Sequence, residues 1–599
     1  MKIYKFFTIA MLSVAAFAVS CDPVDPEDNN PVEKPEEKPE EKPEEKPEEK
    51  PEATLAIDVL EFSFEAEGGE ATFNVTTNQD WTAASDAEWL TLAPQNGTAS
   101  ETATAVTMTA AENTATEVRT ATVTVTAGEL TKTVSVSQAG VAIQDGTEAY
   151  PYLIKTADDM VAMRTKAALD ATTYFRLEAD IDMSSVKKWT PINYDQNFTR
   201  QIHFDGNNKT IKNFAPEAFV GDDQEAAASY PSLFGVLYGS CKNLTIVDSK
   251  IIVSATTPSC GFLGGYVGTT GKPALVENVH VKGEIEGGSN LGGIGGQSRE
   301  GTYKNCTVDV KLTSGGTDVG GLVGKSAVSI SFENCTAKVD LTPSDVVSGN
   351  LRYAGIMGYS SGNTMIIKNC SAEGIINHNE NSLRTAGGIV AYAGAGECMV
   401  SQCKSSVTLT GGKIAAAGGI CGVTSCATGA TIENCYSTGE WYPNQTSAGI
   451  LGKHEKGKTV IANCYSDAKI EGYSGLGGIL GQGVAGQEIV ITDCYAWNPV
   501  ISASREAADK YSSGAIAGSA SGTNTITGCF RNPKLAFTDG FREIADHEDI
   551  TASTIDAAAN QHAFDGKPAA ADATVSSLAK AAGWDAAIWD LSADLPKLK

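Results

Sequence analysis

The chain has 599 residues, a formal net charge of −28 at pH 7, and hydrophobic residues at 42% of its positions. This acidic balance argues against a nucleic-acid-binding protein, which needs clustered cations to neutralise phosphates. The hydrophobic content is sufficient for packed cores, which excludes a wholly disordered chain, and the 61 glycines follow no collagen-like three-residue period.

Residues 1–20 are typical of a secretory signal peptide. Lys2 and Lys5 precede an apolar run over residues 6–19, which is too short to span a membrane, and small residues lead to Cys21. This arrangement resembles the lipobox of bacterial lipoproteins. The resemblance implies cleavage before Cys21, lipid attachment to that residue, and a membrane anchor. The alternative is ordinary signal cleavage beside an incidental cysteine.

Residues 21–53 are expected to form an extended acidic tether. Residues 22–52 hold 14 acidic residues and five lysines, mostly in a Pro-Glu-Glu-Lys repeat. Proline at every fourth position prevents a helix, and the glutamates repel one another, so a spacer is favoured over a charged binding tail. Acidic residues directly after the cysteine also resemble the export signal of Bacteroidetes surface lipoproteins. That resemblance implies a position in the outer membrane, facing the cell exterior.

Residues 54–140 are predicted to form an immunoglobulin-like β-sandwich. Alternation with a period of two over 72–76, 121–126 and 133–137 indicates half-buried strands. The pattern of Trp81, residues 89–94, Gly97, Asn113, Arg119 and residues 136–140 resembles the BACON domain. The family's name implies carbohydrate binding, which makes Trp81 and Trp89 candidates for stacking on a sugar ring. Packing in the sandwich is the alternative, and the more common use of tryptophan in such a domain.

Residues 233–535 are predicted to form a right-handed parallel β-helix, a solenoid. A Gly-Gly-Ile/Leu motif recurs, and its second glycine lies at 293, 321, 355, 388, 419, 449 and 478. A period of about 30 residues with three short strands is typical of one solenoid coil, and successive coils lie about 4.8 Å apart. The repeat resembles the GLUG motif of bacterial surface proteins, which implies an adhesin-like β-helix.

Cysteines recur once in each repeat and are predicted to form a ladder inside the solenoid, with a structural role. The ladder consists of Cys306, Cys335, Cys370, Cys403, Cys435, Cys464, Cys494 and Cys529. Two earlier repeats carry Leu244 and Val279 at this position, so it requires an apolar side chain rather than a thiol. The preceding Asn predicts a turn or an amide ladder. Two further pairs, Cys398/Cys403 and Cys421/Cys426, are either disulfides or stacked thiols.

Helical caps are expected at both ends of the solenoid, because terminal coils would otherwise expose strand edges. Residues 141–232 are predicted to form the N-terminal cap and lead-in, with a helix that begins after Thr156 as its N-cap. Residues 536–599 are predicted to form the C-terminal cap, with a short helix over 576–583.

No motif in the sequence predicts a catalytic residue, a bound metal or a cofactor. Residues 358–362 fit G-x-S-x-G, but they lie at the turn that every repeat contains, and the six histidines form no metal-binding pattern. Carboxylates that a β-helix polysaccharide enzyme would need include Asp309, Asp318 and Asp340, although sequence does not bring them together. Irregular loops over 215–232, 343–352, 377–385 and 503–512 are further candidates for binding a partner.

The sequence therefore predicts a lipid-anchored, non-enzymatic, adhesin-like protein of the cell surface. Its expected ligands are glycans or surface proteins of a host or another microbe, and no nucleic acid is expected. Two alternatives remain open: a surface polysaccharide-degrading β-helix enzyme (a lyase or glycosidase), and a structural spacer in a surface complex.

Overall fold

The computed structural model describes most of the chain from residue 51 onward, in two compact units that divide between Val141 and Ala142. The described residues are 51–141, 143–167, 171–194, 199–221, 230–254, 259–344, 350–377, 383–411, 414–442, 445–503, 513–539, 542–543, 552–555 and 566–599. The predicted signal peptide, Cys21 and nearly all of the predicted tether lie outside these residues, as do most of the loops over 377–385 and 503–512.

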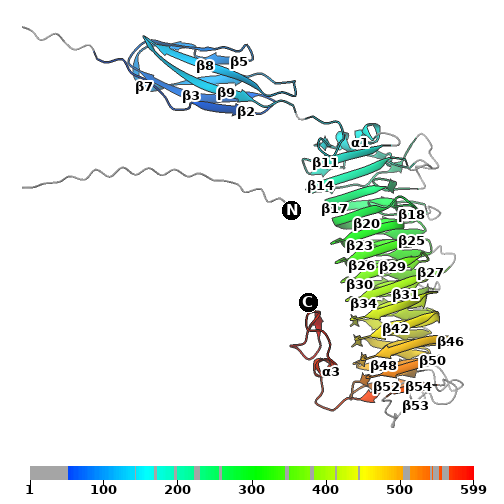
Figure 1. Cartoon of the computed structure of the whole chain (residues 1–599). Coiled ribbons are helices and arrows are strands. Elements are labelled where there is room, and N and C mark those ends of the chain that lie inside the picture. Colours follow the sequence, from blue (N-terminus) through cyan, green and yellow to red (C-terminus); the bar gives the residue numbers. More distant parts are fainter. Residues whose placement is uncertain are drawn as a thin grey trace, which may run out of the picture. The chain divides into compact units, whose positions relative to one another are not determined.

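The first unit is a sandwich of two small sheets (Figure 1). One sheet has the order β1-β3-β7-β5 and the other β2-β9-β8-β4-β6. Their strands are β1 (Leu55–Ile57), β2 (Glu61–Phe64), β3 (Gly69–Thr77), β4 (Trp81–Ser85), β5 (Leu90–Ala93), β6 (Asn96–Gly97), β7 (Ser100–Ala110), β8 (Arg119–Ala127) and β9 (Leu130–Gln138). Side chains alternate between the core and solvent, so Phe73, Val106, Val123 and Val134 are fully buried between the sheets. The alternating segments of the sequence therefore lie in strands, as predicted.

The second unit is a solenoid of parallel strands stacked from coil to coil (Figure 1). Each coil contributes a short strand to a nine-stranded sheet: β18 (Ser259–Cys260), β21 (Asn290–Gly292), β24 (Asp318–Gly320), β27 (Leu351–Ala354), β31 (Leu383–Gly387), β35 (Ala416–Gly418), β40 (Thr446–Ala448), β45 (Leu476–Gly477) and β49 (Ser513–Gly514). The Gly-Gly-Ile/Leu turn follows each of these strands and leads into a 35-stranded sheet that wraps the rest of the coil.

The strands that follow the glycine turn form the next face of the solenoid. They are β16 (Val236–Leu237), β17 (Gly239–Ile252), β19 (Gly264–Val267), β20 (Ala274–Glu286), β22 (Gly295–Lys304), β25 (Val323–Glu333), β28 (Met357–Ser360), β29 (Thr364–Lys368), β32 (Val390–Ala393), β33 (Glu397–Ser401), β36 (Cys421–Ser425), β37 (Gly429–Glu433), β41 (Leu451–Lys456), β42 (Lys458–Ala462), β46 (Leu480–Thr492) and β50 (Ala517–Thr527). Each is hydrogen-bonded in register to its counterpart in the next coil, so equivalent side chains lie in rows along the solenoid axis.

A third face begins after the Asn turn. Its strands are β23 (Thr307–Ser314), β26 (Thr336–Pro343), β30 (Ser371–Asn377), β34 (Lys404–Thr410), β38 (Tyr436–Ser437), β39 (Glu440–Trp441), β43 (Tyr465–Ser466), β44 (Lys469–Gly472), β47 (Tyr495–Ala496), β48 (Val500–Ala503), β51 (Phe530–Arg531) and β52 (Ala536–Asp539). Apolar side chains from all three faces meet in one continuous core that runs from Ile154 to Cys529. The predicted all-β class and β-solenoid are thereby confirmed.

The turn between the second and third faces is an asparagine ladder. Asn278, Asn305, Asn334 and Asn369 all adopt a positive φ of 52–56°, a left-handed conformation that Asn tolerates better than most residues. Each side-chain Nδ2 donates to the Oδ1 of the preceding coil, at 3.0, 3.1, 3.0 and 2.8 Å respectively. These four Asn residues thus satisfy two requirements at once, a turn and an inter-coil amide ladder.

The N-terminal end of the solenoid is covered by a lead-in with one helix. Helix α1 (Ala157–Lys166) begins after Thr156, which forms the predicted N-cap and a capping box with Asp159. Its Met160 and Met163 complete the core of the first coils. The surrounding strands are β10 (Tyr152–Ile154), β11 (Thr172–Leu177), β12 (Ile181–Asp182), β13 (Lys188–Trp189), β14 (Gln201–Lys212) and β15 (Ala218–Phe219).

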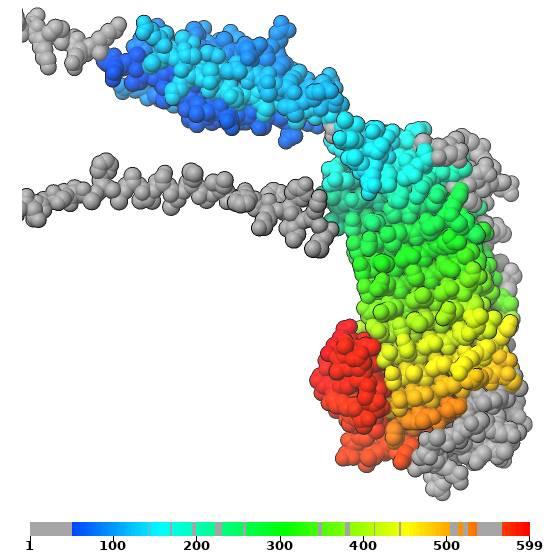
Figure 2. Space-filling model, viewed as in Figure 1, coloured from blue at the N-terminus to red at the C-terminus, as the bar shows by residue number. Residues whose placement is uncertain are grey.

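The described C-terminal residues lie along the flank of the last coils (Figures 1 and 2). After β53 (Arg542–Glu543), β54 (Ala552–Ile555) and β55 (Lys567–Pro568), the chain forms helix α3 (Val575–Ala581) and the small hairpin β56 (Trp589–Asp590) and β57 (Lys597–Leu598). The helix agrees with the one expected over 576–583. Residues 575–599 pack on a side face as a lateral cover, whereas β54 and β55 pair with β50 and β51 of the last coil. Within the described residues, no helix is long and apolar enough to span a membrane.

Candidate functional site

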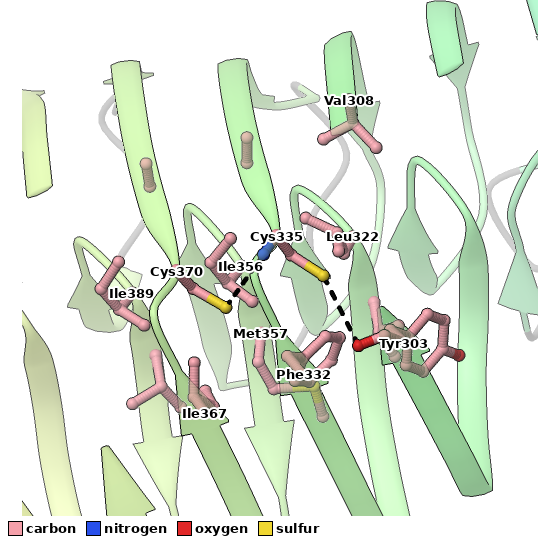
Figure 3. Close-up of a cluster of buried hydrophobic side chains, with 14 of the residues drawn as sticks. Tyr303, Val308, Leu322, Phe332, Cys335, Ile356, Met357, Ile367, Cys370 and Ile389 are labelled. Atoms are coloured by element: carbon pink, nitrogen blue, oxygen red, sulfur yellow. Dashed lines mark hydrogen bonds between the residues drawn. The ribbon is translucent and has the colours of Figure 1, made fainter. Parts of the chain in front are cut away.

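The eight repeat cysteines lie inside the solenoid, each at most 2% exposed. Figure 3 shows Cys335 and Cys370 among Leu322, Ile356 and Ile389; the backbone N–H of Cys335 donates to the Cys370 Sγ at 3.4 Å. Burial raises the pKa of the Cys403 and Cys435 thiols well above the ordinary value, so both thiols are neutral. The structure places these cysteines in packing positions and gives them no access to a ligand.

The four cysteines of the two five-residue pairs are arranged differently from either predicted pairing. Cys403 stays in the ladder, where its thiol donates to the Ser401 carbonyl at 3.2 Å, and the Cys421 thiol donates to the Val423 carbonyl at 3.4 Å. The Sγ of Cys398 instead lies 2.7 Å from the Sγ of Cys426 in the next coil. Within-pair disulfides at Cys398/Cys403 and Cys421/Cys426 are thus replaced by a contact between coils.

Trp81 and Trp89 occupy two different environments in the sandwich. Trp81 is 2% exposed and packs in the core, which corrects the sugar-stacking interpretation for this residue. Trp89 is half-buried, and the guanidinium of Arg119 lies 4.5 Å from its ring centroid. Arg119 is held in place by Gln138 and by the carbonyls of Ala111 and Glu112. A cation therefore already covers one face of Trp89.

The residues considered for catalysis are separated and individually satisfied or buried. Ser360 is fully buried and points into the coil, so it is no exposed nucleophile. Asp309 pairs with Lys282 at 3.6 Å, and Asp340 accepts a hydrogen bond from Asn377 at 2.9 Å, both on the third face. Asp318 belongs to the nine-stranded sheet. Among the described residues, no group of three or more His, Cys, Asp or Glu side chains could hold a metal ion.

An aromatic–cationic stripe runs along the second face of the solenoid and includes Arg352 from strand β27 of the adjoining nine-stranded sheet. We define it as Tyr266, Arg299, Lys325, Arg352, Tyr359 and Tyr392, all of which are half-buried. Four of them share one register row, since Tyr266 pairs with Gln297, Gln297 with Lys325, Lys325 with Tyr359, and Tyr359 with Tyr392. Neighbouring coils are about 4.8 Å apart, so the row presents a ring or a cation at intervals of one or two coils.

The rings and cations of the stripe are in direct contact. The Arg352 guanidinium lies 3.5 Å from the Tyr359 ring centroid, and the Tyr359 and Tyr392 rings meet edge to face at 5.5 Å. Lys325 lies 5.8 Å from the Tyr359 centroid, and Arg299 lies 5.4 Å from that of Tyr266. These are favourable cation–π and aromatic geometries, worth about 0.5–1.5 kcal/mol each. They join Lys325, Arg352, Tyr359 and Tyr392 in one partly exposed cluster, and Arg299 and Tyr266 in another.

Two carboxylates anchor the stripe from either side. Asp318 is 1% exposed and accepts from Arg352 Nε at 2.6 Å, while Tyr392 donates its hydroxyl proton to Glu455 at 3.0 Å. Burial raises the pKa of Asp318, and the positive charge of Arg352 opposes that shift. Burial also raises the pKa of Tyr392, with a smaller contribution from Glu455. The buried carboxylate of Asp318 therefore neutralises the charge of Arg352, whereas Arg299 and Lys325 form no salt bridge within the described residues.

The sequence interpretation missed this stripe, although a signal for it exists. Tyr266, Lys325 and Tyr359 each directly follow the last glycine of the repeat motif, as do Gln297 and Lys453 in other coils. That glycine is needed because a Cβ at Gly324 would lie 2.6 Å from the Asp318 carbonyl oxygen, so the two strands approach too closely for a side chain. The next residue must then point outward. Tracking that one position through the repeats identifies the row.

A second aromatic row, on the third face, is covered by the chain itself. Tyr436, Tyr465 and Tyr495 are in register, and Trp584 and Trp589 of the C-terminal segment pack on them. The Trp589 indole N–H donates to Asn434 at 3.1 Å, and the Tyr465 hydroxyl donates to the Pro596 carbonyl at 2.7 Å. This row is a binding site for residues 566–599.

Beyond the end of this cover, the third face forms a shallow, hydroxyl-rich depression of about 450 Å³. It is lined by Thr336, Ser371, Ala372, Glu373, Lys404, Ser405, Ser406, Tyr436 and Thr438. A neighbouring hollow of about 230 Å³ is bounded by Leu598 and Lys599 of the covering segment. The first hollow includes one ring, that of Tyr436, and the second includes none, whereas the stripe sets three rings beside three cations, so we regard the stripe as the stronger candidate site.

Comparison with known proteins identifies one domain. Residues 79–139 match the BACON family, described as "Putative binding domain, N-terminal", which confirms that part of the sequence interpretation. No curated protein matches the chain.

Among solved structures, a "putative immunoglobulin A1 protease from Bacteroides ovatus" is 22% identical, with 76% of this chain and 94% of that chain covered and a TM-score of 0.25. A structure named "IgA1 Protease" is 15% identical over 60% of this chain and 26% of its own, with a TM-score of 0.33. A Bacteroides ovatus GH5 xyloglucanase is 11% identical over 34% of this chain and 56% of its own, with a TM-score of 0.14. Similarities at these TM-scores carry no argument about activity.

Proposed function

We propose that this protein is a lipid-anchored, non-enzymatic protein of the bacterial cell surface that binds glycan chains along the aromatic–cationic stripe. The observation that carries the proposal is the row of half-buried rings and cations in fixed contact, chiefly Lys325, Arg352, Tyr359 and Tyr392. A sugar ring offers an apolar face to a tyrosine and hydroxyls to the cations beside it. A solenoid repeats this arrangement from coil to coil, which suits an extended chain rather than a small molecule.

The charge of the stripe favours a glycan that carries acidic groups. Neither Arg299 nor Lys325 forms a salt bridge within the described residues, although the charge of Lys325 acts on Asp318, in a protein whose net charge is −28. An anion bound there would gain two cations close to a low-dielectric surface. The BACON match supports a binding role for the first unit as well. The anchor and the outward position rest on the sequence of residues 1–53.

The test is a glycan array probed with residues 22–599 and with the Tyr359→Ala/Tyr392→Ala variant. We expect wild type to bind acidic oligosaccharides and the variant to bind at least about tenfold more weakly, because two stacking contacts of about 1 kcal/mol each are lost. Tyr473→Ala is the matched control, since Tyr473 is 43% exposed and lies outside the stripe. Equal binding by both variants would contradict the stripe as the site.

A parallel assay for new reducing ends or unsaturated products tests the enzymatic alternative. Product release from a bound polysaccharide would replace the non-enzymatic proposal. Absence of binding to any glycan, together with retained folding, would favour the structural spacer. Loss of binding on removing residues 54–140 alone would move recognition to the BACON domain.

A further inference from the structure

The solenoid contains one pair of cysteines that the repeat does not require. Cys398 occupies an inward row whose members in adjacent coils are Met365 and Ala430, and Cys426 lies between β36 and β37. Neither belongs to the eight-residue ladder that follows each Asn or its equivalent. Cys398 and Cys426 both depart from the repeat, lie in adjacent coils and face one another. This arrangement indicates a role that is specific to these two coils.

The distance between these sulfurs differs from every other thiol contact of the structure. The Sγ atoms of Cys398 and Cys426 are 2.7 Å apart. Ladder thiols direct their protons to carbonyl oxygens at 3.1–3.7 Å, as in Cys435, Cys464 and Cys529. The Cys398–Cys426 separation lies between the bond length of a disulfide, about 2.05 Å, and the shortest of these thiol–carbonyl distances.

Both thiols of the pair are buried, and Cys421 is a further cysteine near them. Cys398 is 3% exposed and Cys426 is fully buried, and the Cys426 thiol also lies 3.3 Å from the Ala393 carbonyl. The hydrogen bond with Cys398 lowers the pKa of Cys426, and burial opposes that shift.

We propose that Cys398 and Cys426 form a disulfide bond between adjacent coils in the exported protein. The oxidant is a disulfide donor outside the cytoplasm, such as an oxidised thiol–disulfide oxidoreductase. One thiolate of the pair attacks the donor's disulfide to give a mixed disulfide and a donor thiol. The second thiolate then displaces the other donor sulfur, so the chain loses two protons and two electrons and the donor becomes a dithiol.

The bond would form before the coil closes, because both sulfurs are buried in the folded chain. It rests on the export part of the proposed function, since disulfides persist in oxidising compartments. It also lies behind the stripe, because Cys426 contacts the carbonyl of Ala393, the residue after Tyr392. Closing a loop between positions 28 residues apart would therefore hold the coil that presents Tyr392 to the next coil, which contains β36 and β37.

The test is differential thiol labelling of the full chain, expressed with its export segment. Cells are quenched in acid, and the unfolded protein is alkylated, then reduced and alkylated with a second reagent. We expect two thiols to react only after reduction. Trypsin leaves Cys398 with Cys403 in one peptide and Cys426 with Cys421 and Cys435 in another, so fragmentation spectra must assign the linked sulfurs.

Matched variants make the assignment independent of fragmentation. In Cys398→Ala, Cys426 should react before reduction, and the reverse should hold in Cys426→Ala, whereas Cys403→Ala and Cys421→Ala should keep the bond. Reductant should lower the melting temperature of wild type and leave that of the Cys398→Ala/Cys426→Ala variant unchanged. The wild-type labelling pattern decides the question even where a variant fails to fold.

Full reaction of Cys398 and Cys426 before reduction would overturn the proposal, as would a bond from either residue to any other cysteine. Digestion of intact cells with an external protease reports the surface position separately. A protected protein that still contains the bond would contradict the proposed surface display and leave the disulfide supported. An exposed protein with free thiols would support the proposed surface display and contradict the disulfide.

Discussion

Two rows of tyrosines run along the same solenoid, and they differ in what covers them. Tyr465 and Tyr495 on the third face are at most 2% exposed, because Trp584 and Trp589 of the C-terminal segment pack over them. Tyr359 and Tyr392 on the second face stay half-buried, and they contact Arg352, Glu455 and each other. A solenoid aligns rings from coil to coil by construction. What separates packing from recognition is whether the chain supplies its own cover.

The covered row gives a measure of how such rings are bound when a partner is present. There the partner offers indole rings, one hydrogen bond to Asn434 and a carbonyl acceptor for Tyr465. The uncovered row instead offers cations beside its rings, so its partner should combine a flat apolar face with hydroxyl or acidic groups. The difference in charge between the rows is the basis for expecting a glycan rather than a peptide on the stripe.

The largest effect is expected from Trp589→Ala on the covered row. Removing a side chain that is 1% exposed should weaken attachment of residues 566–599 by about 3–5 kcal/mol. Limited proteolysis and hydrogen exchange should show cleavage and exchange in that segment while the coils stay protected. Tyr473→Ala is the control. Unchanged protection of residues 566–599 would mean that packing of Trp589 on the covered row does not hold this segment in place.

A comparable effect, about 3 kcal/mol, is expected from Arg352→Ala on the uncovered row. The change leaves Asp318 buried and unpaired and removes the cation from Tyr359. Chemical denaturation should show the loss, and adding Asp318→Asn should recover part of it because the stranded charge is gone. Failure of the second change to recover stability would argue against an ionic contribution.

A smaller effect should separate ring from hydroxyl at Tyr392. Tyr392→Phe removes the hydrogen bond to Glu455 and keeps the ring, so the free energy of unfolding should fall by about 1 kcal/mol. Ligand affinity should change by less than in Tyr392→Ala if stacking dominates. Titration of both variants with the array-selected glycan measures this, and equal losses would assign recognition to the hydroxyl.

The smallest effect concerns pH. His454 is fully buried between Thr424, Thr459 and the Gly457 carbonyl, beside Glu455, and burial lowers its pKa from 6.5. The folded state therefore binds fewer protons than the unfolded state, and the stability that His454 contributes is present above pH 6.5 and lost as pH falls below it. Melting temperatures from pH 8 to pH 5 should show a decline that is weaker in His454→Gln. Parallel curves would contradict the assignment.

Much of the architecture could be predicted because it repeats. The Asn-Cys positions, the glycine turns and the alternation in residues 54–140 all carry a period that only one kind of backbone satisfies. Contacts between residues that depart from the period could not be predicted from the sequence. Nothing in the spacing of Cys398 and Cys426 indicates that they face each other, and Trp89 gives no sign that Arg119 lies over its ring.

The sequence by itself therefore determined the sandwich, the solenoid, the buried cysteine ladder and the Asn turn, because each follows from local periodicity and backbone preference. Only the tertiary structure decided which outward residues share a row, that residues 566–599 cover one tyrosine row and leave the other open, and that Trp81 is buried. Those outcomes depend on coil register and on long-range packing. Both bring together residues that are about 30 or more positions apart, and pairwise proximity at that separation is absent from a single sequence.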